Sequence, residues 1–113
     1  MKEIEVIYLQ DAIDFLVELP EAVRGKIAEN ITLVRRGFRN SSLFKKLSGS
    51  EIWEFRTEYG NGAYRLLAFW DKEERSLVVA THGFAKKTQK TPQKEIKKAE
   101  RIRQEYYQKF YNK

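Results

Sequence analysis

The strongest constraint on the fold is a Gly-Asn-Gly triplet at residues 60–62, which separates two runs with period-two alternation. Asn-Gly readily supplies the positive φ angles of a two-residue hairpin turn, so residues 51–59 and 63–71 are predicted to pair as antiparallel strands. Residues 45–48, before Gly49-Ser50, and residues 76–85, after a charged connection, extend this pattern on both sides. The chain is therefore expected to contain an antiparallel meander.

One more strand and a helical hairpin are predicted before the meander. Residues 2–9 start with polar/apolar alternation, which is typical of a strand. Asp11 is expected to cap a short helix that ends before Pro20, and a second helix follows and stops at Gly37. The apolar stripe of this second helix comprises Val23, Ile27, Ile31 and Val34.

A last helix is predicted after the meander. Thr91 is placed at its cap and Pro92 in its first helical position. Its apolar stripe comprises Ile96, Ala99, Ile102, Tyr106 and Phe110. The resulting order, β-α-α-β-β-β-β-α, predicts a small α+β domain with an antiparallel sheet, an N-terminal helical hairpin and a C-terminal helix.

Composition limits the classes of protein to which this chain can belong. Its 113 residues suffice for one domain, taken as residues 1–113. With no cysteine, disulfides and thiolate metal sites are excluded and a cytoplasmic location is expected. The one histidine, His82, cannot form a multi-histidine metal site. We expect no membrane partner, because the sequence contains no apolar run near 20 residues and no signal-peptide pattern.

The net charge of +6 is concentrated near the C-terminus. Residues 84–113 hold 10 Lys/Arg and 3 Glu, whereas residues 1–83 hold 12 Lys/Arg and 13 Asp/Glu. Such a concentration indicates a polyanionic partner, which could be nucleic acid, an acidic protein or a membrane surface.

The turn chemistry also predicts which side chains share a face of the sheet. If Asn61-Gly62 forms the turn, Trp53 lies opposite Trp70, and an aromatic face becomes the core under the helices. The other face then carries Arg56 and Arg65 as diagonal neighbours. Glu54 and Glu58 lie on that same face.

The next connection has two possible closures, which predict the same pairing. Either Glu73-Glu74 or all of residues 72–75 form the turn, and in both cases Arg65 faces His82, with Phe84 further along the same face. A bulge would flip part of a strand to the other face. The predicted pairing places Arg56, Arg65 and His82 beside the lysines of residues 86–90.

Each of these features also has an ordinary structural explanation. The two arginines could form surface ion pairs with Glu54 and Glu58, which are alternatively possible general bases. His82 could be a structural histidine, and the lysine run a solvated loop. The aromatic side chains that could stack on bases are more simply buried, namely Tyr64, Trp70 and Tyr106. The sequence contains no glycine-rich phosphate loop and no nucleophile elbow.

Two stretches of the sequence carry motifs of a known protein family. The first, residues 82–92, reads His-Gly-Phe-Ala-Lys-Lys-Thr-Gln-Lys-Thr-Pro and continues to Glu95-Ile96 and Ala99. The second combines Lys46-Leu47, residues 52–56 (Ile-Trp-Glu-Phe-Arg) and residues 64–67 (Tyr-Arg-Leu-Leu). Together they resemble HigB-like toxins, the phage-derived branch of the RelE/ParE toxin superfamily. The likeness extends from about Ile4 to Ala99 with the same order of elements, and implies the RelE-like fold.

The resemblance implies the toxin of a type II toxin–antitoxin pair, a ribosome-dependent mRNA endonuclease that inhibits translation. Such toxins cut mRNA in the ribosomal A site without metal or other cofactor, by attack of the 2′-hydroxyl on the adjacent phosphate. The expected catalytic residues are Arg56, Arg65 and Lys86, with His82 added because of its predicted place beside Arg65. The expected RNA-binding residues are Lys45, Lys46, Lys87 and Lys90. The expected partners are mRNA, the ribosome and a cognate helix-turn-helix antitoxin.

Two alternatives belong to other functional classes. The ParE branch of the same superfamily inhibits DNA gyrase and needs no catalytic site, and fold does not separate the branches. A basic RNA-binding module without toxicity is the second alternative. The Lys-Lys-Thr-Gln-Lys run at residues 86–90 favours the ribonuclease.

Overall fold

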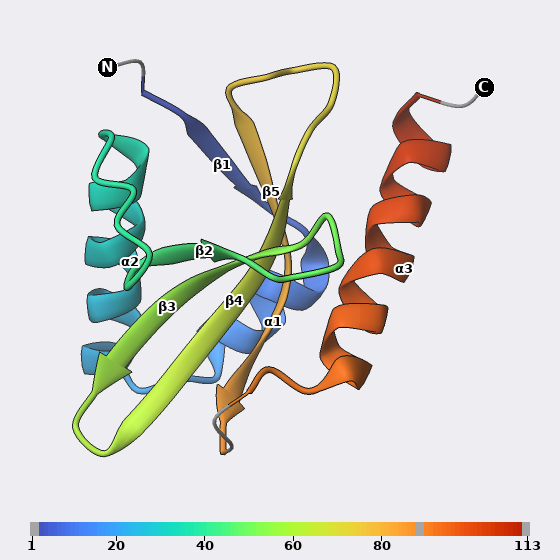
Figure 1. Cartoon of the computed structure of the whole chain (residues 1–113). Coiled ribbons are helices and arrows are strands. Elements are labelled where there is room, and N and C mark those ends of the chain that lie inside the picture. The colour runs from blue at the N-terminus through green and yellow to red at the C-terminus, as the bar shows by residue number, and fades with distance from the viewer. Residues whose placement is uncertain (1–2, 88–89, 112–113) are drawn as a thin grey trace.

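The computed structural model describes residues 3–87 and 90–111, so residues 88–89 of the predicted lysine run lie outside the described residues. It confirms the predicted mixed α+β architecture and the predicted order of elements (Figure 1). The strands are β1 (Glu5–Tyr8), β2 (Phe44–Lys46), β3 (Trp53–Tyr59), β4 (Gly62–Trp70) and β5 (Leu77–Lys86). The helices are α1 (Gln10–Val17), α2 (Glu21–Arg35) and α3 (Gln93–Phe110).

The five strands form one sheet in the order β1-β5-β4-β3-β2. β1 runs parallel to β5, whereas the other neighbouring strands are antiparallel, as expected for a meander. One face of the sheet packs against α1 and α2 through the predicted stripe of α2 and aromatic residues of β2 and β3. This face is the predicted aromatic core, with Phe44 stacked on both Trp53 and Phe55.

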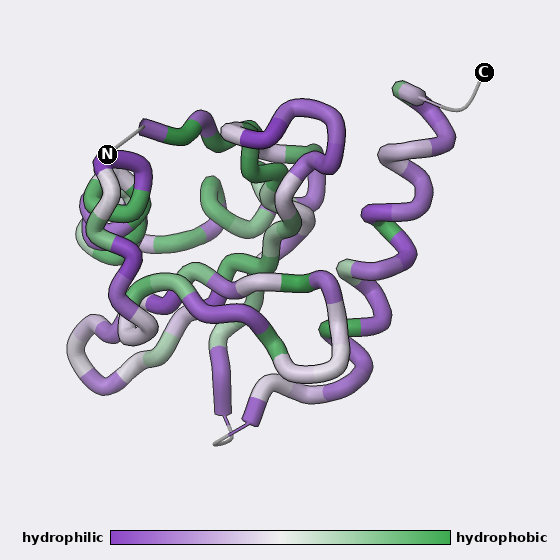
Figure 2. Tube along the Cα trace, turned by 45° about the horizontal axis from the view of Figure 1, so that its top comes forward, coloured by the Kyte–Doolittle hydropathy of each residue, from purple (hydrophilic) through white to green (hydrophobic). Residues whose placement is uncertain are grey.

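The opposite face of the sheet is covered by α3 over part of its area. Ile96, Ala99 and Tyr106 of α3 pack against Leu67 and Phe69 of β4. α3 lies on the other side of the sheet from α2 (Figure 1) and is mostly hydrophilic along its length (Figure 2). The remaining area of this face, near the β3–β4 turn, is available for a polar site.

The helix ends differ in detail from the predictions. Gly37 has φ of 110° just after α2, which confirms the predicted stop. Asp11 is not a cap, because α1 begins at Gln10 and Leu9 precedes it. Pro92 takes the cap position of α3, which leaves the Thr91 side chain for another contact. Phe110, predicted in the apolar stripe, is half exposed.

The predicted pairing of β3 with β4 is wrong by two residues. Tyr59 pairs with Gly62, so the turn is Gly60-Asn61 rather than Asn61-Gly62, and Gly60 has φ of 58°. Trp53 therefore lies opposite Ala68 instead of Trp70. Because side chains alternate with a period of two, a shift of two residues leaves every side chain on its predicted face.

The predicted pairing of β4 with β5 is also wrong, by one residue near the connection between the two strands and by two residues beyond a bulge. Between Leu67 and Ala68 the pairing shifts by one residue, with Thr81 as the extra residue of β5. Arg65 lies opposite Phe84, while His82 lies opposite Leu67. His82 therefore lies two residues further along β4 than predicted.

None of the helices within the described residues has the length and apolarity needed to cross a membrane.

Candidate functional site

Two arginines from neighbouring strands form the centre of the site. Arg56 of β3 lies directly opposite Arg65 of β4, closer than the diagonal placement predicted from the sequence. The Arg65 side chain is only 3% exposed, and the Arg56 side chain is 26% exposed. Two buried or half-buried cations side by side require negative charge nearby.

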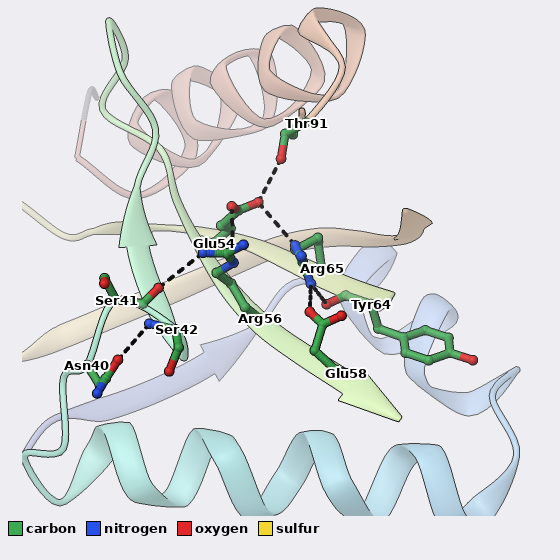
Figure 3. A network of polar contacts seen from close by, with 9 residues as sticks. All are labelled: Asn40, Ser41, Ser42, Glu54, Arg56, Glu58, Tyr64, Arg65 and Thr91. Atoms are coloured by element: carbon green, nitrogen blue, oxygen red, sulfur yellow. Dashed lines mark hydrogen bonds and ion pairs between the residues drawn. The ribbon is translucent and has the colours of Figure 1, made fainter. Parts of the chain in front are cut away.

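Glu54 supplies one of these negative charges from β3. Its carboxylate lies 3.8 Å from Nε of Arg56 through one oxygen and 3.8 Å from Nε of Arg65 through the other (Figure 3). Thr91 Oγ1 donates a hydrogen bond to Glu54 Oε1 at 2.7 Å. The residue predicted to cap α3 thus connects the start of that helix to the arginine pair.

Glu58 supplies the second negative charge at the solvent side. Arg65 Nη1 donates to Glu58 Oε2 at 2.9 Å and to the Tyr64 carbonyl at 3.0 Å. The predicted ion pairs of the arginines with Glu54 and Glu58 are thereby present. Within the described part of the chain, Nε of Arg56 and Nε of Arg65 are buried without a hydrogen-bond acceptor.

The loop between α2 and β2 holds Arg56 from the other side. Arg56 Nη1 donates to the Ser41 carbonyl at 3.2 Å, and the Arg56 backbone N–H donates to the Leu43 carbonyl at 2.8 Å. Asn40 Oδ1 accepts the Ser42 N–H at 2.8 Å, which shapes the loop as an Asx turn. The contribution of this loop could not be predicted from the sequence, because a backbone carbonyl carries no sequence signal for a distant arginine.

A groove of about 680 Å³ opens over the arginine pair. It is lined by Ser42, Arg56, Glu58, Ala63, Arg65, Lys86 and Lys87. Partial burial and the nearby Arg65 guanidinium lower the pKa of Lys86, against the opposing effect of Glu54. One groove is therefore lined by four residues that were predicted to share a site, namely Arg56, Arg65, Lys86 and Lys87.

A second groove of about 600 Å³ adjoins the first, because Arg56 and Lys86 line both. Lys45, Lys46 and Lys90 also line it, together with Glu54 and the start of α3. All three lysines are exposed. The structure thus brings the predicted RNA-binding lysines to the edge of the arginine site.

His82 lies outside both grooves, buried beneath α3. Its Nε2 is 3.0 Å from Glu95 Oε1, and its Nδ1 is 3.1 Å from Thr81 Oγ1. Burial lowers the pKa of His82, while the hydrogen bond with Glu95 opposes this effect. Its environment is that of a histidine that fastens the first turn of α3 to β5.

The arrangement is suited to binding a phosphate group. Arg keeps its charge at every relevant pH and can donate two parallel hydrogen bonds to phosphate oxygens. Here two guanidinium groups and two ammonium groups line one groove, beside a second groove with further lysines. Such a set can hold a sugar–phosphate backbone and stabilise negative charge that develops at phosphorus.

The chain matches a known protein family over most of its length. Residues 14–104 match the family described as "Phage derived protein Gp49-like (DUF891)". The chain belongs to this family. A comparison with curated proteins yields no significant match. The Gp49-like match agrees with the phage-derived branch indicated by the sequence and does not confirm HigB specifically.

Solved structures share the fold of this Gp49-like chain at low sequence identity. A mutant of Escherichia coli toxin RelE in the free state superposes with a TM-score of 0.63 at 17% identity, over 89% of this chain and 97% of that one. The toxin–antitoxin complex RelBE2 of Mycobacterium tuberculosis gives 0.56 at 23% identity, over 76% and 94%. The archaeal RelE–RelB complex of Pyrococcus horikoshii gives 0.50 at 13% identity, over 72% and 92%. The chain therefore has the RelE toxin fold.

Proposed function

We propose that this Gp49-like protein is the toxin of a type II toxin–antitoxin pair and cuts mRNA in the ribosomal A site. The observation that carries the proposal is the groove in which Arg56, Arg65 and Lys86 converge. The RelE fold and the phage-derived family support the toxin role, as does the structural likeness to the RelBE2 toxin–antitoxin complex and to the archaeal RelE–RelB complex. A cognate antitoxin, expected to be a small helix-turn-helix protein, would keep the toxin inactive.

The arginine pair would bind the scissile phosphate. During cleavage the 2′ oxygen forms a bond to phosphorus while the bond to the 5′ oxygen breaks, which leaves a 2′,3′-cyclic phosphate and a 5′-hydroxyl. Negative charge grows on the phosphorane oxygens before the leaving group departs. Arg56 and Arg65 stabilise that charge, and Glu54 keeps the two guanidinium groups in place.

Proton transfer must accompany this step, because the 2′-hydroxyl loses a proton and the 5′ oxygen gains one. Lys86 is the group best placed to donate a proton to the 5′ oxygen, since it lines the groove and its lowered pKa makes its proton easier to release, while water takes the proton of the 2′-hydroxyl. In this proposal His82 positions α3 and does not transfer a proton, because its ring lies outside the grooves with both nitrogens engaged. Lys45, Lys46, Lys87 and Lys90 contact the RNA backbone.

Induction of the chain in a bacterium, followed by mapping of mRNA 5′ ends, tests the proposal. The wild type is expected to arrest growth and to create new 5′-hydroxyl ends within codons that are being translated. Lys86→Met and Arg65→Ala should lower cleavage on programmed ribosomes by about 100-fold or more, as loss of a transition-state donor does. Lys86→Met retains an aliphatic stem in its place, so it is the variant expected to fold in case Arg65→Ala does not.

A matched control is Arg101→Ala, which removes one exposed positive charge from α3, away from both grooves. It should cleave like the wild type. Growth arrest with DNA damage and intact mRNA would contradict the nuclease proposal and support a gyrase inhibitor instead. Salt-dependent RNA binding without cleavage or growth arrest would support a plain RNA-binding module.

A further inference from the structure

Glu58 places a carboxylate inside the groove that we assign to RNA. Its side chain is 66% exposed, whereas the Arg65 side chain to which it binds is 3% exposed. Glu58 Oε2 accepts a hydrogen bond from Arg65 Nη1 at 2.9 Å (Figure 3), and both residues line the groove. An acidic side chain therefore sits on the solvent side of the cation that a phosphate would need to reach.

The two glutamates of the site differ in how firmly they are held. Glu54 is buried, receives a hydrogen bond from Thr91 and lies between both arginines, so its removal would leave buried charge uncompensated. Glu58 is near the end of β3 with most of its side chain in solvent. An ion pair with one exposed partner contributes little and exchanges readily. Glu58 is consequently the displaceable member of the network.

A phosphate oxygen and a carboxylate oxygen make the same kind of hydrogen bond to a guanidinium group. The two therefore compete for Nη1 of Arg65. We propose that Glu58 is a built-in competitor, which occupies Arg65 in the free protein and is displaced when an RNA phosphate enters the groove. This inference rests on the proposed function, because it takes the incoming ligand to be the phosphate of single-stranded RNA.

The consequence is that removing the Glu58 charge improves binding. Calorimetric titration of Glu58→Gln with inorganic pyrophosphate and with a short single-stranded RNA should give affinities about two- to fivefold tighter than the wild type, the range that corresponds to one exposed ion pair. Glu51→Gln makes the same change in net charge at an exposed residue that lines neither groove. It should bind both ligands with the wild-type affinity.

Three outcomes would overturn the competitor role. The first is that Glu58→Gln binds pyrophosphate no more tightly than the wild type does, and the second is that Glu51→Gln gains as much affinity. The third is that Glu58→Gln abolishes cleavage on programmed ribosomes at unchanged affinity, which would make Glu58 a proton-transfer residue. These binding measurements do not depend on cleavage, so they distinguish failure of the competitor role from failure of the nuclease proposal. If the nuclease proposal fails, wild-type protein leaves mRNA intact, whatever the affinity of Glu58→Gln.

Discussion

At the scale of single residues, His82 shows how burial sets the charge of a histidine. Its ring is 3% exposed and lies between Thr81 and Glu95. Burial is the largest effect and lowers the pKa, the Glu95 contacts and Asp11 raise it, and Lys98 lowers it. Since the pKa is below its ordinary value of 6.5, the ring is neutral in the folded protein near pH 7.

This shift predicts a specific loss of stability in mild acid. Below pH 6.5 the unfolded chain binds a proton at His82 that the folded chain binds only at lower pH, so the free energy of unfolding falls as pH falls through that window. His82→Gln removes this contribution. In urea titrations from pH 7.5 to 5, the difference in unfolding free energy between wild type and variant should shrink below pH 6.5, by at most about 1.4 kcal/mol per pH unit. A difference that stays constant with pH would contradict the assignment.

At the scale of elements, α3 is fastened to the sheet by polar contacts at both ends. At its start, Thr91 donates to Glu54. At its end, Tyr106 and Tyr111 donate to the buried carboxylate of Asp71, at 2.7 and 3.0 Å. Burial alone would raise the pKa of Asp71, but these hydrogen bonds and those from the Glu73 and Glu74 N–H groups lower it overall.

The two ends of α3 are predicted to loosen independently. Asp71→Asn should destabilise the protein by about 1–3 kcal/mol, because Tyr106 and the turn lose a charged acceptor. In hydrogen exchange, its effect should be largest in the last turns of α3. Thr91→Val, which keeps the shape of the side chain, should instead speed exchange in the first turn. Equal acceleration along the whole helix in either variant would mean that α3 detaches as one unit.

The sequence predicted the elements and faces better than the pairings. The alternation of polar and apolar residues correctly predicted that Arg56 and Arg65 share a face of the sheet. The two-residue error in the turn does not change that face, because side chains alternate with a period of two. The bulge at Thr81 could not be predicted, since it depends on how β5 fits against β4 and α1. The bulge accounts for one of the two residues by which His82 is displaced from Arg65, and the connection between β4 and β5 accounts for the other. The contact of Thr91 with Glu54 was also missed, because a threonine before a proline resembles an ordinary cap.

At the scale of the whole molecule, the exposed lysines fall into two sets that lie in different places. Lys45, Lys46 and Lys90 line the groove beside the arginine site, although Lys90 is far from the other two in the sequence. The lysines Lys94, Lys97 and Lys109 are exposed on α3 and line neither of these grooves. The two sets contribute equally to the net charge, but we expect a bound RNA strand to contact only the first set.

Salt dependence separates these two sets of lysines. Each phosphate contact with single-stranded RNA releases counterions and contributes about 0.7 to the slope of log affinity against log salt concentration. Replacing Lys45, Lys46 and Lys90 with Gln should therefore reduce that slope by about 2, as measured by fluorescence anisotropy with a short RNA. Replacing Lys94, Lys97 and Lys109 removes the same charge and should leave the slope nearly unchanged, because screened charges away from the strand release no counterions. Equal slopes for the two triple variants would show that RNA responds to overall charge and follows no defined path along the groove.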